Sequence, residues 1–212
     1  GRRGLRLCQV REDLIDTQLA ALAAAHAKTK AELWVMAPMV ATLEEAEWFA
    51  EKARAAGLPK VGIMIEIPAA AIRADQMLSV VDFASIGTND LTQYTMAADR
   101  MDGELAPLLN AWQPAVLQMI KFACEGGRAT GKPVGVCGEA GGDPLLALVL
   151  TGLGVASLSM APSKVRAVRA GLRMHDLATC QQMAAFAVDA PTPEEGRNNV
   201  LKLVAPAMQA LL

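Results

Sequence analysis

The sequence predicts an α/β protein in which short buried strands alternate with longer helices. Five apolar runs show little polar alternation, which is typical of strands buried on both faces of a parallel sheet. These runs are residues 33–37, 61–66, 80–86, 134–137 and 156–160. Helical patterns follow them over 42–56, 68–78, 113–130, 144–150 and 162–172. Apolar residues make up 53% of the chain but aromatic residues only 4%, which favours helices packed on strands over an aromatic-rich β-sandwich.

Local signals support the helices in chain order. A long helix is expected over 12–28, before the first strand. Thr42 followed three residues later by Glu45 is a capping box, and Pro68 stands where a first-turn proline would stand. Asp143 and Ser163 provide further helix starts. A terminal helix is expected over 193–212, and the whole chain, 1–212, is predicted to form one domain.

Composition argues against several classes of protein. The formal net charge is −2 and no basic stripe stands out, so nucleic acid is a poor candidate partner. No apolar run approaches the roughly 20 residues that a membrane span needs. The chain has 4 cysteines without CxxC spacing and 2 histidines, so no zinc-like cluster is expected. These features predict a cytoplasmic protein with reduced thiols.

Polar side chains follow two neighbouring predicted strands. Glu66 ends the second strand between apolar neighbours, and Asn89 and Asp90 follow the third strand after Gly87. Because the carboxyl ends of parallel strands meet at one edge of a sheet, Glu66 and Asp90 are expected to lie close together. Two carboxylates with free positions for water or substrate suit Mg²⁺. The alternatives are that Glu66 pairs with an arginine or caps a helix, and that the Asn89–Asp90 pair only caps the next helix.

Three further features carry chemistry. Arg100 stands in the loop beyond Asp90, where a guanidinium suits a phosphate or carboxylate, although a surface arginine is the alternative. Cys137 ends the fourth strand, where a thiol can act as acid or nucleophile or simply fill space as a small apolar group. The run from Arg2 to Arg6 suits either an anion or a solvated helix start, and the residues alone favour the second. His26 and His175 are expected to have no role.

Three separated motifs resemble the phosphoenolpyruvate-utilising enzyme family: residues 62–71, residues 86–95 with 98–100, and residues 136–139. The stretch 91–95 followed by Asp99 and Arg100 is more similar to the enzyme I branch, from the bacterial sugar phosphotransferase system, than to pyruvate phosphate dikinase or phosphoenolpyruvate synthase. Residues 1–6 also resemble an enzyme I segment, Gly-x-Arg-x-x-Arg, that opens a helix. The resemblance covers nearly the whole chain.

The resemblance implies a fold and a set of roles. The fold would be the C-terminal (β/α)₈ TIM-type barrel of the family, truncated at its N-terminal side so that about five of its strands are present. Mg²⁺ would bind to Glu66 and Asp90. Cys137 would protonate the enolate carbon as pyruvate forms. Substrate would be held by Asn89, Asp90, Arg100 and Arg3.

The implied activity is that of a phosphoenolpyruvate-protein phosphotransferase. Such an enzyme moves a phosphoryl group from phosphoenolpyruvate to its own histidine and then to a histidine-containing phosphocarrier protein for sugar uptake. That histidine lies on an upstream domain in the family and nothing here matches it, so the chain alone is expected to be inactive. A homodimer is also expected. The alternatives are a dikinase or synthase relative and a non-catalytic dimerisation or ligand-sensing module.

Overall fold

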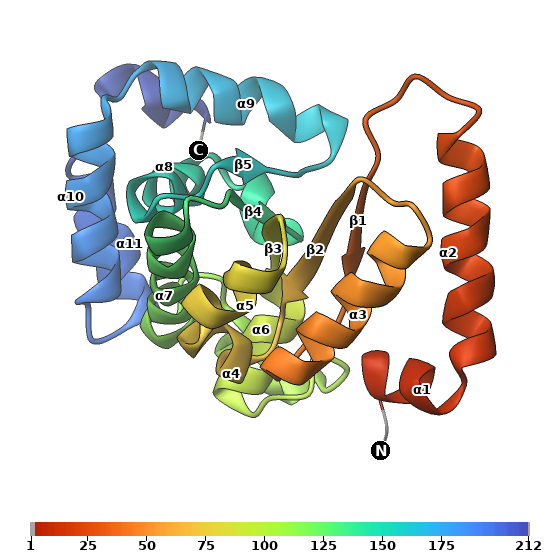
Figure 1. Ribbon diagram of the computed structural model, residues 1–212. Coiled ribbons are helices and arrows are strands. Elements are labelled where there is room, and N and C mark those ends of the chain that lie inside the picture. The colour runs from red at the N-terminus through yellow and green to blue at the C-terminus, as the bar shows by residue number, and fades with distance from the viewer. Residues whose placement is uncertain (1–2, 212) are drawn as a thin grey trace.

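The structure confirms the predicted α/β class and places all strands in one sheet (Figure 1). It is a computed structural model and describes residues 3–211. The strands are parallel, and each one pairs with its neighbours in the sequence. They are β1 (Trp34–Ala37), β2 (Lys60–Ile65), β3 (Phe83–Gly87), β4 (Val134–Cys137) and β5 (Ser157–Leu158). A strand order that never reverses differs from a doubly wound sheet; closure into a barrel stays a prediction.

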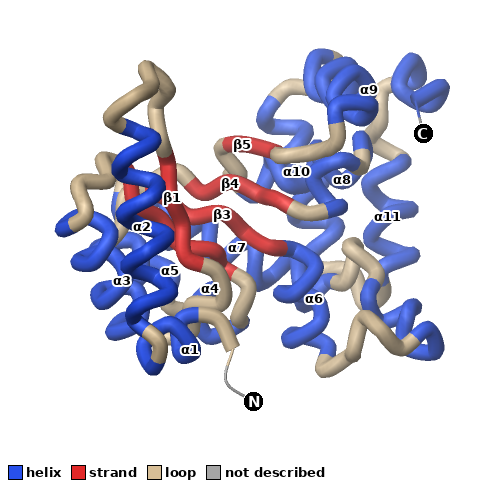
Figure 2. The backbone as a smooth tube through the Cα atoms, turned by 90° about the vertical axis from the view of Figure 1, so that its right-hand side faces the viewer, coloured by secondary structure: helices blue, strands red, loops and turns tan. Residues whose placement is uncertain are grey.

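Helices connect and cover these strands. The first group is α1 (Leu5–Val10), α2 (Glu12–His26), α3 (Leu43–Ala55), α4 (Pro68–Ile72), α5 (Ala74–Val80) and α6 (Thr88–Met96). The second group is α7 (Pro114–Thr130), α8 (Pro144–Leu153), α9 (Pro162–Arg173), α10 (Leu177–Val188) and α11 (Pro193–Leu201). Three 3₁₀ helices are η1 (Gly103–Leu109), η2 (Glu139–Gly142) and η3 (Pro206–Leu211). Figure 2 shows the helices packed around the central strands.

One face of the sheet is apolar and forms the centre of the core. The strand register aligns these side chains in rows across the sheet, and helices α3, α4 and α7 contact the strands. Most of the aligned side chains are fully buried, which removes apolar surface from water. They are Val35, Ala37, Val61, Ile63, Ile65, Ala84, Ile86, Val134, Val136 and Leu158.

The opposite face is open to solvent at β1, so the prediction of strands buried on both faces is wrong for this strand. Trp34 is 44% exposed and Met36 is 39% exposed, although both are large apolar residues. The Trp34 ring lies 4.8 Å from the ring of Phe83, and Lys60 Nζ lies 5.2 Å from the Trp34 ring. Aromatic and cation–π contacts thus hold Trp34 in place without burying it.

Helix α2 forms a second layer over α3. Ile15 and Leu19 are buried, and Lys52 of α3 forms ion pairs with Glu12 at 2.9 Å and with Asp16 at 2.7 Å. The predicted helix over 12–28 is therefore confirmed, although it ends at His26. Within the described residues, no helix combines the length and the apolar character that crossing a membrane requires.

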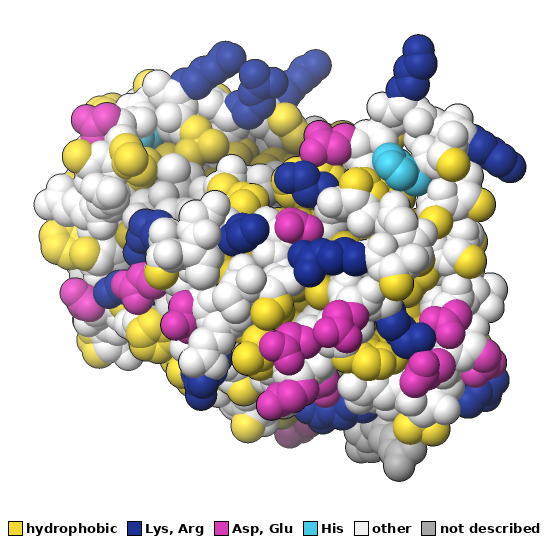
Figure 3. All heavy atoms as spheres, in the orientation of Figure 1, with side chains coloured by type: hydrophobic (Ala, Val, Ile, Leu, Met, Phe, Trp, Pro, Cys, Tyr) yellow, Lys and Arg dark blue, Asp and Glu magenta, His cyan; other side chains and the backbone are white. Residues whose placement is uncertain are grey.

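Helices α9, α10 and α11 lie together on the side of the molecule away from α2 (Figure 1). The buried residues on the inner side of α9 are Val168 and Gly171. A Cβ atom at Gly171 would lie 2.9 Å from Met208 Cε of η3. The basic residues of α9 face water, and Lys and Arg side chains stand along the upper edge of Figure 3, over this helix. The helix is amphipathic, with one stripe on the core and a charged outer side.

The predicted helix starts are mostly confirmed. Thr42 and Glu45 form the full capping box of α3, and Pro68 occupies the first turn of α4. Asp143 caps α8 by accepting hydrogen bonds from the Leu145 and Leu146 N–H groups. The prediction for Ser163 is wrong, because α9 begins at Pro162 and its capping residue, Ala161, has no side-chain oxygen.

Three predicted boundaries are also wrong. The strand expected from residue 80 begins at Phe83, because Val80 still belongs to α5. The helix expected over 68–78 is divided at Arg73, whose φ of −108° is not helical. The helix expected over 193–212 ends at Leu201, where the chain changes to turns that precede a separate 3₁₀ helix, η3, beginning at Pro206; its last predicted residue lies outside the described part of the chain. Helix α10 was not predicted.

Candidate active site

Glu66 lies buried at the carboxyl edge of the sheet, directly after β2. It is only 6% exposed, and its Oε2 accepts a hydrogen bond of 2.8 Å from the Met39 N–H group. Gly87 at the end of β3 lies against it, since a Cβ atom there would be 2.6 Å from Glu66 Oε1. The absence of a side chain at Gly87 therefore leaves space for the Glu66 carboxylate.

Asp90 brings a second carboxylate to the same place from the first turn of α6. Its side chain is 21% exposed. Burial raises the pKa of Glu66, the Met39 hydrogen bond opposes this effect, the charge of Asp90 raises the pKa further, and the charge of Arg100 lowers it. A buried carboxylate next to a like charge is costly unless a cation joins them.

The two carboxylates fit a hard divalent cation that keeps free coordination positions. Within residues 3–211 there is no group of three or more His, Cys, Asp or Glu side chains that could hold a metal ion. Mg²⁺ differs from ions that need a complete protein cage, since it is often held by one or two carboxylates and takes its remaining oxygens from water and substrate. Glu66 and Asp90 meet that requirement.

Arg100 lies beside this carboxylate pair. Its Nη1 is 3.7 Å from Asp90 Oδ2, its side chain is half exposed, and its N–H group donates a 3.0 Å hydrogen bond to Gln93 Oε1. Ala97 ends α6 in the left-handed conformation, with φ of 50°, which turns the chain back toward Asp90. The guanidinium is thus available to an anion near the carboxylates.

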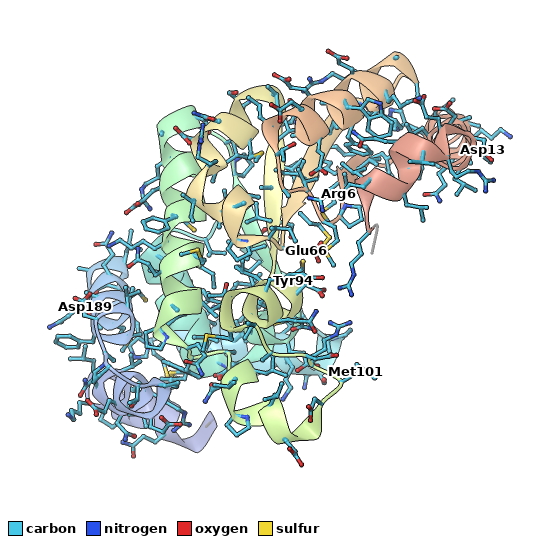
Figure 4. The ribbon with its side chains drawn as sticks, turned by 90° about the horizontal axis from the view of Figure 1, so that it is seen from below. Arg6, Asp13, Glu66, Tyr94, Met101 and Asp189 are labelled. Atoms are coloured by element: carbon cyan, nitrogen blue, oxygen red, sulfur yellow. The ribbon has the colours of Figure 1, made fainter. Side chains whose placement is uncertain are left out.

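Arg3 approaches the site from the segment before α1. Its Nη1 donates a 2.8 Å hydrogen bond to the Tyr94 hydroxyl group on α6. Arg3, Asp90, Tyr94 and Arg100 line one hollow of about 700 Å³. The view from below in Figure 4 labels Glu66, Tyr94 and Met101 on this side of the molecule.

The other arginines of the N-terminal run have different places. Arg6 forms an ion pair of 2.9 Å with Glu45, which is only 6% exposed and also accepts hydrogen bonds from the Ala41 and Thr42 N–H groups. This ion pair therefore stabilises the packing of α1 against the start of α3. Gly1 and Arg2, which belong to the segment that resembles the family, lie outside the described residues.

Cys137 ends β4, next to the end of β3. Its Sγ lies 3.4 Å from the Ile86 carbonyl oxygen, and the Thr88 hydroxyl group donates to the Cys137 carbonyl oxygen at 3.2 Å. Gly138 follows with φ of 97°, and a Cβ atom there would lie 3.3 Å from Asn89 Oδ1. Asn89 therefore lies over the end of β4, near the thiol-bearing residue.

A second hollow, of about 490 Å³, continues the site past Arg100. Asn89, Arg100 and Glu139 line it, so Arg100 faces both hollows. The site therefore runs along the carboxyl ends of β2, β3 and β4, where parallel α/β folds bind their ligands.

The structure brings the predicted site residues to one edge, although their roles stay predictions. The alternative that Asn89 and Asp90 cap a helix is wrong, because Gly87 is the capping residue of α6 and both side chains lie inside its first turn. Gln93 and Tyr94 were missed as contributors. Their signal was present, since both stand in the stretch 91–95 that carried the family resemblance.

The two histidines lie away from this edge. Both ring nitrogens of His175 are engaged, one 2.8 Å from the Gly171 carbonyl oxygen and the other accepting from the Ala205 N–H group at 3.0 Å. His26 ends α2. Neither residue contributes to the carboxyl edge of the strands.

A carboxylate pair, two arginines, an amide and a thiol at the end of parallel strands define a class of site that can hold a small anion with a divalent cation. Comparison with known families agrees with this chemistry. Residues 1–177 match the model described as "PEP-utilising enzyme, PEP-binding domain", and the chain belongs to this family of phosphoenolpyruvate-utilising enzymes.

Curated relatives specify the branch of the family. The chain is 51% identical, over 93% of its length, to the phosphoenolpyruvate-protein phosphotransferase of Streptomyces coelicolor, and covers 36% of that protein. It is 40% identical, over 92% of its length, to the protein of the same name from Listeria monocytogenes, of which it also covers 36%. It is 46% identical to the multiphosphoryl transfer protein of Xanthomonas campestris and covers 24% of it. The chain thus spans about a third or less of the length of these relatives.

Proposed function

We propose that this chain is the phosphoenolpyruvate- and Mg²⁺-binding part of a phosphoenolpyruvate-protein phosphotransferase. The phosphoryl group would pass to an enzyme histidine that this chain does not supply, and then to a histidine-containing phosphocarrier protein. The meeting of Glu66 and Asp90 beside Arg100 is the observation that carries the proposal. The names of the curated relatives favour this function over a dikinase, a synthase or a sensing module.

The site residues would neutralise and orient a highly charged substrate. Glu66 and Asp90 would hold Mg²⁺, which supplies positive charge to the phosphoryl oxygens when bound. Arg100 and Arg3 would bind the anionic groups of phosphoenolpyruvate, and the Asn89 amide would donate to a phosphate oxygen. Phosphoryl transfer depends mainly on positioning and charge neutralisation, which is what these side chains offer.

Cys137 would complete the reaction by acting as an acid. Transfer of the phosphoryl group leaves the enolate of pyruvate, and its methylene carbon must gain a proton to become a methyl group. The thiol would give that proton and regain one from solvent. Its place at the end of β4, next to the end of β3, supports this role.

Replacement of Asp90 by asparagine tests the metal site. With Mg²⁺ present, Asp90→Asn is expected to bind phosphoenolpyruvate at least tenfold more weakly, because it removes one of two anionic ligands. Calorimetric titration with and without Mg²⁺ measures this effect. Asp75→Asn is the matched control, because Asp75 is exposed on α5 and away from the site. Equal binding by wild type with and without Mg²⁺ would refute the proposed site.

The isolated chain is expected not to release pyruvate from phosphoenolpyruvate, even with phosphocarrier protein present. Neither of its 2 histidines lies at the site, and both ring nitrogens of His175 are engaged. A coupled assay that follows pyruvate measures this directly. Steady turnover by the 212-residue chain would contradict the proposed need for a histidine elsewhere.

We also propose that the chain associates as a homodimer. The half-exposed Trp34 and Met36 on the open face of the sheet support association, because exposed large apolar groups favour burial against a partner. Light scattering measures the mass in solution. A mass equal to one chain over the whole accessible concentration range would contradict it.

A further inference from the structure

One turn of α6 contacts both arginines of the candidate site. Tyr94 Oη accepts a 2.8 Å hydrogen bond from Arg3 Nη1, and Gln93 Oε1 accepts a 3.0 Å hydrogen bond from the backbone N–H group of Arg100. Asp90, one turn earlier on the same helix, lies 3.7 Å from the Arg100 guanidinium. A single rigid element thus connects the carboxylate that would bind metal with both cations that would bind substrate.

These contacts matter because neither arginine is held by burial. Arg3 is exposed and lies in the segment before α1, and the side chain of Arg100 is 50% exposed. A long arginine side chain in water samples many rotamers, and ordering it on binding weakens affinity. The Tyr94 hydrogen bond orders the Arg3 guanidinium before the substrate arrives and so removes part of that cost, whereas the Gln93 hydrogen bond fixes the backbone from which the Arg100 side chain extends.

We propose that Tyr94 and Gln93 are positioning residues: Tyr94 holds the Arg3 guanidinium, and Gln93 holds the backbone at Arg100, so that both arginines line the hollow in which one anion binds. The inference rests on the proposed function for its substrate, phosphoenolpyruvate. The hollow of about 700 Å³ is lined by all four residues, Arg3, Gln93, Tyr94 and Arg100. The two helix residues act through the arginines and need not touch the substrate.

The first test uses the protein without ligand. Tyr94→Phe removes only the hydroxyl group that holds Arg3. The Arg3 side-chain N–H signal, followed by ¹⁵N relaxation, is expected to show an ordered group in wild type and a mobile group in Tyr94→Phe. Thr95→Val is the matched control, because it deletes a hydroxyl group on the next residue that has no hydrogen-bond partner among the described residues. Equal mobility of Arg3 in wild type and Tyr94→Phe would overturn the proposal for Tyr94.

The second test separates positioning from general damage to the site. Tyr94→Phe is expected to weaken phosphoenolpyruvate binding about threefold to tenfold, the loss that corresponds to an ordinary net hydrogen-bond contribution of about 0.7–1.4 kcal/mol. Binding of Mn²⁺ alone, measured by electron paramagnetic resonance as a substitute for Mg²⁺, is expected to stay unchanged. A parallel loss of both affinities would indicate a structural role and overturn the proposal.

Gln93 has its own pair of variants. Gln93→Met cannot accept the Arg100 N–H hydrogen bond, whereas Gln93→Glu can. Faster hydrogen exchange at the Arg100 amide is expected in Gln93→Met and recovery in Gln93→Glu, and equal exchange in all three proteins would overturn this half. If wild type has an ordered Arg3 but binds no phosphoenolpyruvate, the proposed function fails, and the substrate role of both residues fails with it.

Discussion

Gly152→Ala is expected to destabilise the protein by about 3 kcal/mol, near the upper end for overpacking in a core. Gly152 lies in α8 where α10 crosses it, and an added Cβ atom would overlap the carbonyl group of Cys180 and lie 2.8 Å from the Gln181 nitrogen. The obstacle is backbone of a second helix and not the end of a flexible side chain. The methyl group therefore fits only if the two helices move apart.

Urea and thermal unfolding measure this effect. A loss of about 3 kcal/mol corresponds to a fall in Tm of roughly 6–12 °C for a protein of this size. Gly103→Ala is the matched control, because no atom lies within 4 Å of its Cβ position and its backbone conformation is ordinary. An unchanged urea midpoint for Gly152→Ala would show that α8 and α10 are not packed as closely as described.

Glu66→Gln is expected to stabilise the ligand-free protein at neutral pH while it weakens Mg²⁺-dependent binding of phosphoenolpyruvate at least tenfold. Burial, with the charge of Asp90, raises the pKa of Glu66, so the ionised form is costly in the folded protein. Gln removes the charge but keeps an oxygen that can accept from the Met39 N–H group. Stability and binding should therefore change in opposite directions.

The sign of the pH dependence follows from the raised pKa. Between the ordinary value near 4.5 and the higher folded value, the folded protein binds more protons at Glu66 than the unfolded chain. Wild type should thus lose stability as pH rises through this window, relative to Glu66→Gln. The two proteins should converge below the window, where Glu66 is neutral in both states.

Urea unfolding at several pH values measures this difference. Each kcal/mol of relieved cost raises Tm by roughly 2–4 °C in a domain of this size. Glu51→Gln, an exposed position on α3, controls for the loss of one negative charge. If Glu66→Gln were less stable than wild type at neutral pH, the Met39 N–H group and the charge of Arg100 would stabilise the ionised carboxylate by more than burial and Asp90 destabilise it.

The strands were predictable from sequence because short apolar runs between helical patterns are a simple local signal, which persists even at β1, where one face of the sheet is open to solvent. All five apolar runs overlap a strand, and Thr42 and Asp143 mark helix starts through side-chain chemistry that needs no distant partner. The sequence did not predict the helix break at Arg73 or the close approach of the α10 backbone to Gly152 in α8. Such features carry no periodic signal and need the three-dimensional packing.

The site divides in the same way. The proximity of Glu66 and Asp90 was predictable because the carboxyl ends of neighbouring parallel strands converge. The pairing of Arg3 with Tyr94 was not, since the two residues are 91 positions apart and their contact depends on where α1 lies. For Arg6, likewise, only the structure shows Glu45 as the partner.

The pairing of β3 with β4 also has a kinetic consequence. The chain between Ala84 and its partner Val134 is more than twice as long as the chain between Gly62 and its partner Phe83, because α6, η1 and α7 lie between β3 and β4. Each doubling of a loop adds roughly 0.6 kcal/mol to the entropy cost of closing it. The segment between β3 and β4 carries Asn89, Asp90 and Arg100. Pairing of β3 with β4 therefore has the highest entropy cost of loop closure between adjacent strands as the sheet folds.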